Sequence, residues 1–150
     1  ATGNALDILG DAIDSDMVPR IEGLGLLPTQ AEYHMMRRHN SYYVGKFGDM
    51  DIVGFKSLFG HSHGVGEALF DTVKGVGRDG QEGSGEGFRR GGLMATYLIG
   101  PLLILNPPLC KWLLREMGAA SDVLAFEEAA MDSYQKRVAE FLEPGRSWKY

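Results

Sequence analysis

The histidines are the residues of this sequence whose type could do chemistry, and two of them are close together. His61 and His63 flank Ser62 in an HxH arrangement. Such a pair could place two imidazoles on a metal ion or a pigment, with Glu67 as the nearby third ligand. This pattern suggests one hypothesis, a metal-dependent enzyme that uses His61 and His63. The alternative is a polar loop, because no nucleophile elbow or catalytic triad surrounds Ser62.

The other two histidines, His34 and His39, are five residues apart in a segment that we expect to be helical. Residues at this spacing do not share one face of a helix, so the two would not bind one ion together. Each could ligate the magnesium of a chlorophyll if the chain lies in a pigment complex, and so could His61 and His63. The alternative is that these side chains make hydrogen bonds or stay at the surface.

A glycine motif and a lone cysteine offer little further chemistry. Gly75, Gly77 and Gly80 fit the spacing GxGxxG, which in dinucleotide-binding proteins cradles a pyrophosphate at a helix N-terminus. Here the motif continues into more glycine and serine, so a flexible linker is the favoured interpretation. Cys110, beside a hydrophobic run, is expected to be buried and inert. No paired carboxylates share an apolar face, so general acid–base chemistry has no support and we expect a protein that is not an enzyme.

Composition limits the class of protein. The 150 residues suit one domain with a real hydrophobic core. The formal net charge of −5 argues against a nucleic-acid partner, which would require a basic surface. The single cysteine excludes an internal disulfide bond and a zinc site built on cysteines. Glycine is abundant, with 21 residues, so the chain buries few side chains for its length and is expected to lean on partners.

The elements expected to position these residues are mostly helices. Apolar spacing predicts a short amphipathic helix within residues 1–18, which Pro19 ends. Thr29 and Glu32 have the spacing of a capping box, which predicts a helix over residues 30–44.

The middle and the end of the chain differ in character. Residues 46–77 mix aromatic residues with glycines and predict loops with one short helix near residues 65–74. Residues 75–87 are low in complexity and predict a flexible linker or an exposed loop. Ser121 as an N-cap and an apolar stripe at three- and four-residue steps predict an amphipathic helix over residues 121–143.

The most informative segment is hydrophobic, because the twenty residues from Gly91 to Cys110 carry no charge. As one helix they would span about 30 Å, the thickness of a bilayer core, with Trp112 as an interfacial anchor. Pro101 would kink that helix, and Asn106 with the two prolines after it would break it, leaving a separate helical turn beyond the break. The residues expected in this marginal membrane segment are Gly92, Leu93, Tyr97, Leu98, Ile99, Pro101, Leu105 and Trp112.

Residues 90–108 also carry a local resemblance. The stretch RGGLMATYLIGP, followed by LLILNPPL, resembles the first membrane segment of the photosystem I reaction-centre subunit XI. The shared features are an Arg-Gly entry, small residues and an aromatic-Leu-Ile-Gly-Pro run, here from Tyr97 to Pro101. Met94 stands where that family has a pigment-binding histidine. The resemblance implies a small accessory subunit of a photosynthetic membrane complex.

These observations predict a mainly α fold with long irregular segments, one proline-kinked transmembrane helix and amphipathic surface helices. The expected regions are an N-terminal arm (1–74), a Gly-rich linker (75–90), a membrane or buried segment (91–117) and a C-terminal helix with a tail (118–150).

The predicted function is that of a non-catalytic accessory subunit of an energy-converting membrane complex, a photosystem rather than a respiratory complex. Its partners would be other subunits and the lipid bilayer, with chlorophyll, carotenoid or lipid at the interface. The expected location is the thylakoid membrane, and the alternative is the mitochondrial inner membrane. The alternative function is that of a soluble all-helical interaction or assembly protein in which residues 92–117 form a buried helical hairpin.

Overall fold

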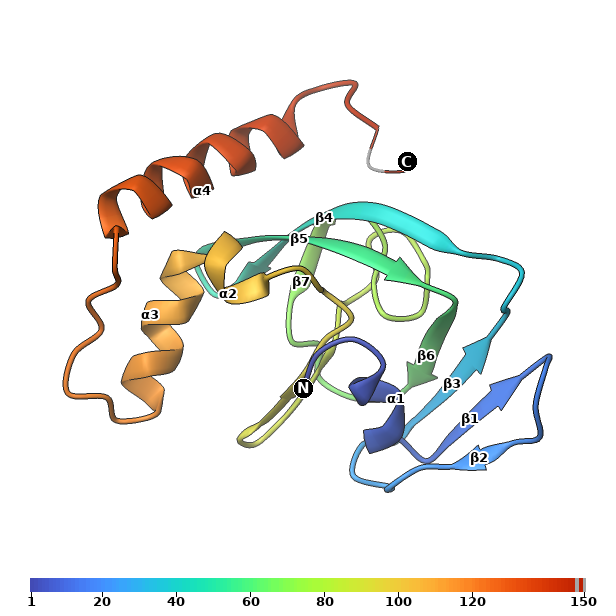
Figure 1. Cartoon of the computed structure of the whole chain (residues 1–150). Coiled ribbons are helices and arrows are strands. Elements are labelled where there is room, and N and C mark those ends of the chain that lie inside the picture. The colour runs from blue at the N-terminus through green and yellow to red at the C-terminus, as the bar shows by residue number, and fades with distance from the viewer. Residues whose placement is uncertain (148, 150) are drawn as a thin grey trace.

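The computed structural model describes residues 1–147 and residue 149, and strands dominate it (Figure 1). Strand takes 36% of the chain and helix only 24%, so the predicted mainly α fold is wrong and the fold is mixed α/β. Among the described residues, no helix combines the length and the apolar character that crossing a membrane requires, which overturns the predicted transmembrane helix. In chain order the elements are α1 (Ala5–Leu9), β1 (Ala12–Ser15), β2 (Ile21–Glu22), β3 (Thr29–Tyr33), β4 (His39–Phe47), β5 (Met50–Leu58), β6 (Gly60–Gly64), β7 (Asp71–Lys74), β8 (Phe88–Arg90), β9 (Leu93–Ala95), α2 (Leu102–Leu105), α3 (Pro107–Glu116) and α4 (Glu127–Leu142).

A long antiparallel hairpin forms the centre of the fold. Its strands, β4 and β5, pair from His39 opposite Leu58 to Phe47 opposite Met50. Gly48, in the two-residue turn, has a φ of +57°, a left-handed conformation that glycine adopts without steric cost. Because β7 pairs with the other edge of β4, the hairpin becomes a three-stranded sheet.

A second sheet has the strand order β2-β1-β3-β6. Its β1 and β3 strands are parallel, and the two outer pairs are antiparallel. Only Phe59 separates the end of β5 from the start of β6, so one stretch of chain leaves the first sheet and joins the second (Figure 1). This continuity ties the two sheets together.

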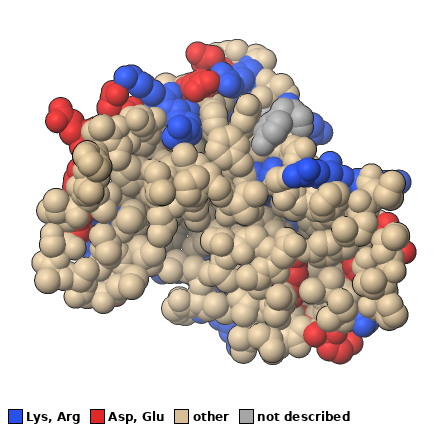
Figure 2. Space-filling model, viewed as in Figure 1, with Lys and Arg blue, Asp and Glu red and all other residues tan. Residues whose placement is uncertain are grey.

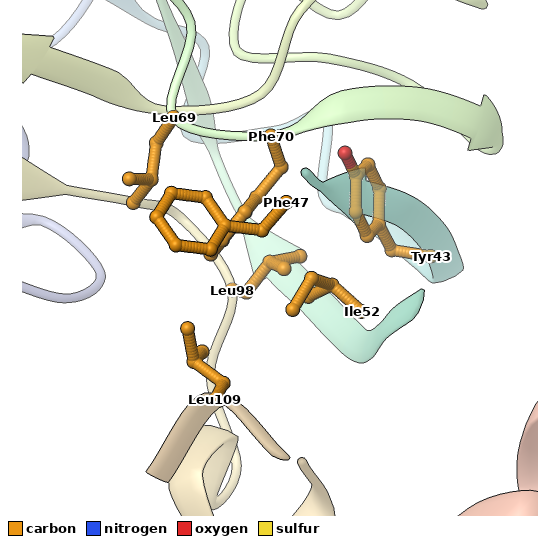
Figure 3. Packing of buried hydrophobic residues seen from close by; sticks show 7 residues of the cluster. All are labelled: Tyr43, Phe47, Ile52, Leu69, Phe70, Leu98 and Leu109. Atoms are coloured by element: carbon orange, nitrogen blue, oxygen red, sulfur yellow. The ribbon is translucent and has the colours of Figure 1, made fainter. Parts of the chain in front are cut away.

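The largest hydrophobic cluster lies on one face of the hairpin (Figure 3). Leu109 points into it from α3, and Leu98 enters from the segment after β9. The rings of Phe47 and Phe70 meet edge to face, with their centroids 6.0 Å apart. These contacts join the hairpin to α3, the helix in which the hydrophobic run ends.

The other face of the hairpin is covered by α4, which lies across it (Figure 1). Tyr134 and Phe141 on α4 pack with Val44 and Val53 of the hairpin. The prediction of an amphipathic helix in this region is confirmed, but α4 begins at Glu127 instead of directly after Ser121.

Strands replace the predicted helix over residues 30–44. In β3, Thr29 and Ala31 are buried while Gln30 and Glu32 are exposed. This period of two is that of a strand, and it places Thr29 and Glu32 on opposite faces, so the apparent capping box caps nothing.

Of the two other helix predictions in the first half of the chain, one is wrong and one is partly confirmed. Residues 46–77, predicted as loops with one short helix, contain β5, β6 and β7. Alternation is weak in the hairpin because both of its faces are buried: Ile52 faces the cluster of Figure 3 and Val53 faces α4. The short helix predicted within residues 1–18 is present as the five residues of α1, but it ends at Leu9 instead of near Pro19, and β1 follows.

The hydrophobic run is divided among several short elements. Gly91 and Gly92 turn the hairpin between β8 and β9. The predicted break is confirmed, because α2 ends at Leu105 and α3 begins at Pro107. The run is therefore neither one span nor one helical hairpin. The other predicted membrane residues are spread over these elements. Leu93 lies in β9, Pro101 precedes α2 and Trp112 lies on α3. Between β9 and α2, Tyr97 and Leu98 are buried, and the Ile99 amide donates to the Phe55 carbonyl.

Candidate docking site

An apolar cleft of about 720 Å³ opens between the helices α2 and α3 and the β8–β9 hairpin. Figure 2 shows the molecule hollowed between these parts, with a mostly uncharged surface around the hollow. Its lining includes Leu69, Met94, Leu102, Ile104, Trp112 and Leu113. The predicted membrane residues Leu93 and Pro101 also line it, so much of the apolar signal in the sequence belongs to this cleft.

Asn106 fixes the helical wall of the cleft. Its side-chain Oδ1 accepts from the amide of Val53 at 2.8 Å, and its Nδ2 donates to the carbonyls of Val53 and Leu102, both at 2.8 Å. The buried side chain therefore pairs with the edge of β5 as a neighbouring strand would. Trp112, further along this wall, packs edge to face on Phe47 with the ring centroids 4.7 Å apart.

The opposite wall is formed by the first residues of the chain, which run parallel to the end of β9. The Gly3 amide donates to the Thr96 carbonyl at 2.8 Å, and the Thr96 amide donates to the Ala1 carbonyl at 3.1 Å. The amino nitrogen of Ala1 donates to the Met94 carbonyl at 2.7 Å. The backbone groups of this edge are therefore already paired where they border the cleft.

A polar pocket of about 640 Å³ adjoins the cleft, and Leu69 and Trp112 line both. Its charged lining residues are Asp49, Glu67, Asp71, Glu116, Lys46 and Arg89. Four carboxylates against two basic groups give this pocket a net charge of −2. Lys46 is already paired with Asp51 at 2.7 Å, whereas none of the four carboxylates forms an ion pair within residues 1–147. The pocket therefore favours a cation.

Beneath the cleft, a buried ion pair holds the loop of residues 75–87. Lys56, on β5, is paired with Glu86, and both side chains are fully buried. The Lys56 ammonium also donates to the carbonyls of Val76 and Gly77, at 2.7 and 2.8 Å. These bonds attach the loop to the sheet.

Glu86 carries the same network to the cleft wall. Its Oε1 accepts from the Thr96 hydroxyl and from the Tyr97 amide, both at 2.8 Å. Burial lowers the pKa of Lys56, and the adjacent Glu86 carboxylate opposes that lowering. The ion pair therefore provides hydrogen-bond partners for the buried carbonyls of the loop and for the buried Thr96 hydroxyl and Tyr97 amide of the cleft wall.

A second buried acid, Asp7, gathers three hydroxyl groups. Its carboxylate accepts from Tyr33 at 2.6 Å, from Ser62 at 2.8 Å and from Tyr97. Burial raises the pKa of both tyrosines and the Asp7 carboxylate adds to the effect, so both stay protonated as donors. Since the four residues come from α1, β3, β6 and the segment after β9, the network fastens α1 to the sheet.

Two of the predicted site residues, His39 and His61, come together, with ring centroids 5.6 Å apart. The Nε2 atom of His39 is 2.9 Å from the Ser41 hydroxyl. Burial lowers the pKa of His61 to about 4, and the neighbouring His39 and Lys56 add to the lowering. The Nδ1 atom of His61 is buried and has no hydrogen-bond partner among the described residues.

Of the other two histidines, His63 is close enough to add to the lowering of the pKa of His61. His34, in the loop after β3, is 3.2 Å from the Glu32 carboxylate and 3.8 Å from that of Asp16. His63 is exposed on β6, a strand rather than the predicted polar loop. Within residues 1–147 and 149, no group of three or more His, Cys, Asp or Glu side chains could hold a metal ion. The assignment of the four histidines as pigment ligands stays a prediction.

The glycine motif and the cysteine take no part in either pocket. The stretch from Gly75 to Gly80 does not open a helix, and a Cβ at Gly77 would lie 2.2 Å from the Ser84 carbonyl oxygen. The glycine therefore serves close packing within the loop. Cys110 is half-buried on α3, so it is less enclosed than we expected.

Comparisons with known proteins give no family for this chain. No protein-family model matches it, and a search of curated proteins finds no match.

Proposed function

We propose that this chain is a non-catalytic interaction module that docks an apolar segment of a partner protein in the cleft. The observation that carries the proposal is a concave apolar surface with fixed walls. Ile104 is 74% exposed and Leu103 is 40% exposed, although both belong to the cleft lining. Covering such groups is favourable by about 25 cal/mol for each Å² of apolar surface removed from water, and exposed apolar patches mark interaction sites.

A partner segment suits the cleft better than a small polar substrate does. Small-molecule sites carry a few polar groups that orient the ligand. Here the Thr96 hydroxyl is already bonded to Glu86, and the backbone of Met94 is paired with Ala1. No histidine or cysteine is found among the described residues that line the cleft or the polar pocket, which supports binding over catalysis.

Membership of an energy-converting membrane complex stays a prediction of the sequence, together with the expected pigment or lipid at its interface. In such a complex the cleft would be the contact with a neighbouring subunit, in place of the predicted membrane span. The resemblance to subunit XI rests on residues that the fold distributes among β8, β9, α2 and α3.

Binding of a neutral amphipathic peptide tests the proposal. The peptide is a labelled helix of about 15 residues with leucine on one face at i, i+3, i+4 and i+7 and glutamine elsewhere, and fluorescence anisotropy measures its affinity. Ile104→Glu is expected to weaken binding by about tenfold or more, because a carboxylate would be buried among apolar groups.

Val123→Glu is the matched control, because Val123 is also 74% exposed but lies outside the cleft. Its affinity for the peptide should equal that of the wild type. The proposal fails if the wild type does not bind the peptide, or if Ile104→Glu binds it as well as Val123→Glu does.

A further inference from the structure

We infer that the docked segment is an α-helix whose end over the adjoining polar pocket carries lysine or arginine. This inference rests on the proposed function, and it adds the secondary structure and the charge of the partner.

The pairing of the backbone in the cleft selects a helix over a strand. An extended segment binds by adding hydrogen bonds to a free sheet edge. The edge of β9 at the cleft is occupied, because Met94 and Thr96 are bonded to Ala1 and Gly3. The edge of β5 behind the helical wall is occupied by Asn106. A helix satisfies its own backbone groups and needs only the apolar lining.

The helix α3 leads from the cleft to the polar pocket. Leu109 and Leu113 line the cleft, Trp112 lines both spaces, and Glu116, one turn beyond Trp112, lines the pocket. A docked helix that runs along α3 therefore has one end over the pocket. The C-terminal turn of α3 adds the negative end of a helix dipole to the net charge of −2 there. Charge complementarity then calls for a basic end on the partner.

A second copy of this chain is not the occupant that these features select. Its longest amphipathic helix is α4, and the apolar side chains Tyr134 and Phe141 of that helix are already buried against the hairpin. The partner is therefore a different protein with a free amphipathic helix.

Three peptides with the same leucine face test the charge. Their last turn carries two lysines, two glutamines or two glutamates, and the lysine peptide should bind about fivefold more tightly than the glutamine peptide. The glutamate peptide should bind most weakly, and salt should narrow the differences by screening. A fourth peptide, with a central proline in the neutral sequence, should lose binding because it cannot form the helix.

The double variant Glu67→Gln/Glu116→Gln should remove most of the preference for the lysine peptide. Glu128→Gln, at an exposed position on α4, is the control and should keep it. Equal affinities for the three charge variants, or a preference that survives the double variant, would overturn the basic end. Tight binding of the proline peptide would overturn the helix. In these cases the binding of the neutral peptide and its sensitivity to Ile104→Glu still decide the proposed function separately.

Discussion

Replacing Lys56 by methionine removes the cation from the buried pair with Glu86 while it keeps the length of the side chain. The Glu86 carboxylate then stays buried with only the Thr96 hydroxyl and the Tyr97 amide as donors. The Val76 carbonyl loses its donor as well, while the Gly77 carbonyl keeps the Gly80 amide, 3.2 Å away. The variant should therefore be strongly destabilised.

The magnitude follows from these losses. Breaking a buried ion pair by removing one partner costs about 3–5 kcal/mol, because the remaining charge is uncompensated. The Val76 carbonyl, left without a donor, adds about 1–3 kcal/mol. We therefore expect a loss of about 4–8 kcal/mol, a large share of the roughly 5–15 kcal/mol by which most domains are stable.

Urea unfolding followed by circular dichroism measures the free energy of unfolding of this variant. Lys136→Met is the control, because Lys136 is 76% exposed in an ion pair with Asp132, and it should change stability by less than about 0.5 kcal/mol. The double variant Lys56→Met/Glu86→Gln removes the stranded charge and should recover about 1–2 kcal/mol relative to Lys56→Met. A loss below about 1 kcal/mol in Lys56→Met would show that the pair does not hold the loop.

Three other substitutions test separate features. Asn106→Ala should lower the free energy of unfolding by about 2–3 kcal/mol, because the three hydrogen bonds of the side chain to the backbone disappear. Urea unfolding measures this change. A change below about 0.5 kcal/mol would contradict the role of Asn106 in the cleft wall. His61 has a pKa of about 4 in the folded protein against 6.5 as its ordinary value, so the unfolded chain binds more protons between these pH values and stability falls as the pH drops from 6.5 to 4. After allowance for the exposed part of the ring, this loss of stability is about 1–2 kcal/mol. It should be missing in His61→Gln when the urea midpoints at pH 7 and pH 4 are compared. If His61→Gln keeps the pH dependence of the wild type, His61 is not its source. Phe126 is 88% exposed with a φ of +54°, so Phe126→Asn should raise the melting temperature by relieving about 1 kcal/mol of backbone strain; a lower melting temperature would refute the strain.

The sequence predicted correctly those elements that are determined by residues close together in the chain. The apolar stripe of α4 repeats at helical spacing, and the helix forms where the stripe lies. The break before α3 was predicted because Pro107 and Pro108 exclude a continuous helix whatever surrounds them. Even here, the role of Asn106 was missed, because its partner Val53 is 53 residues away in the chain.

The strands were missed because burial on both faces removes alternation. In the β4–β5 hairpin, neighbouring residues such as Val53 and Ile52 are both buried, one against α4 and one against the cluster of Figure 3. In a single sequence, such a run cannot be distinguished from a buried helix or a loop by its periodicity. The capping-box spacing of Thr29 and Glu32 then pointed to a helix that tertiary pairing overrides.

The candidate site was predicted only as an apolar signal. Leu93, Pro101 and Trp112 were assigned to a membrane, and the structure places them around the cleft. The sequence does not show this because the facing wall comes from the first residues of the chain. The loop of residues 75–87 is attached to the sheet by the ion pair between Glu86 and Lys56, which lies 30 residues earlier in the chain. No local pattern in the sequence encodes that contact.

The passage of the chain from β5 to β6 has a consequence for how the molecule opens. Because only Phe59 lies between the two strands, β5 cannot leave its sheet without pulling on β6 and on its partner β3. The two sheets should then behave as one cooperative unit in native-state hydrogen exchange. The slowest amides of β4 and of β3 should exchange through the same opening, with the same free energy and the same dependence on denaturant.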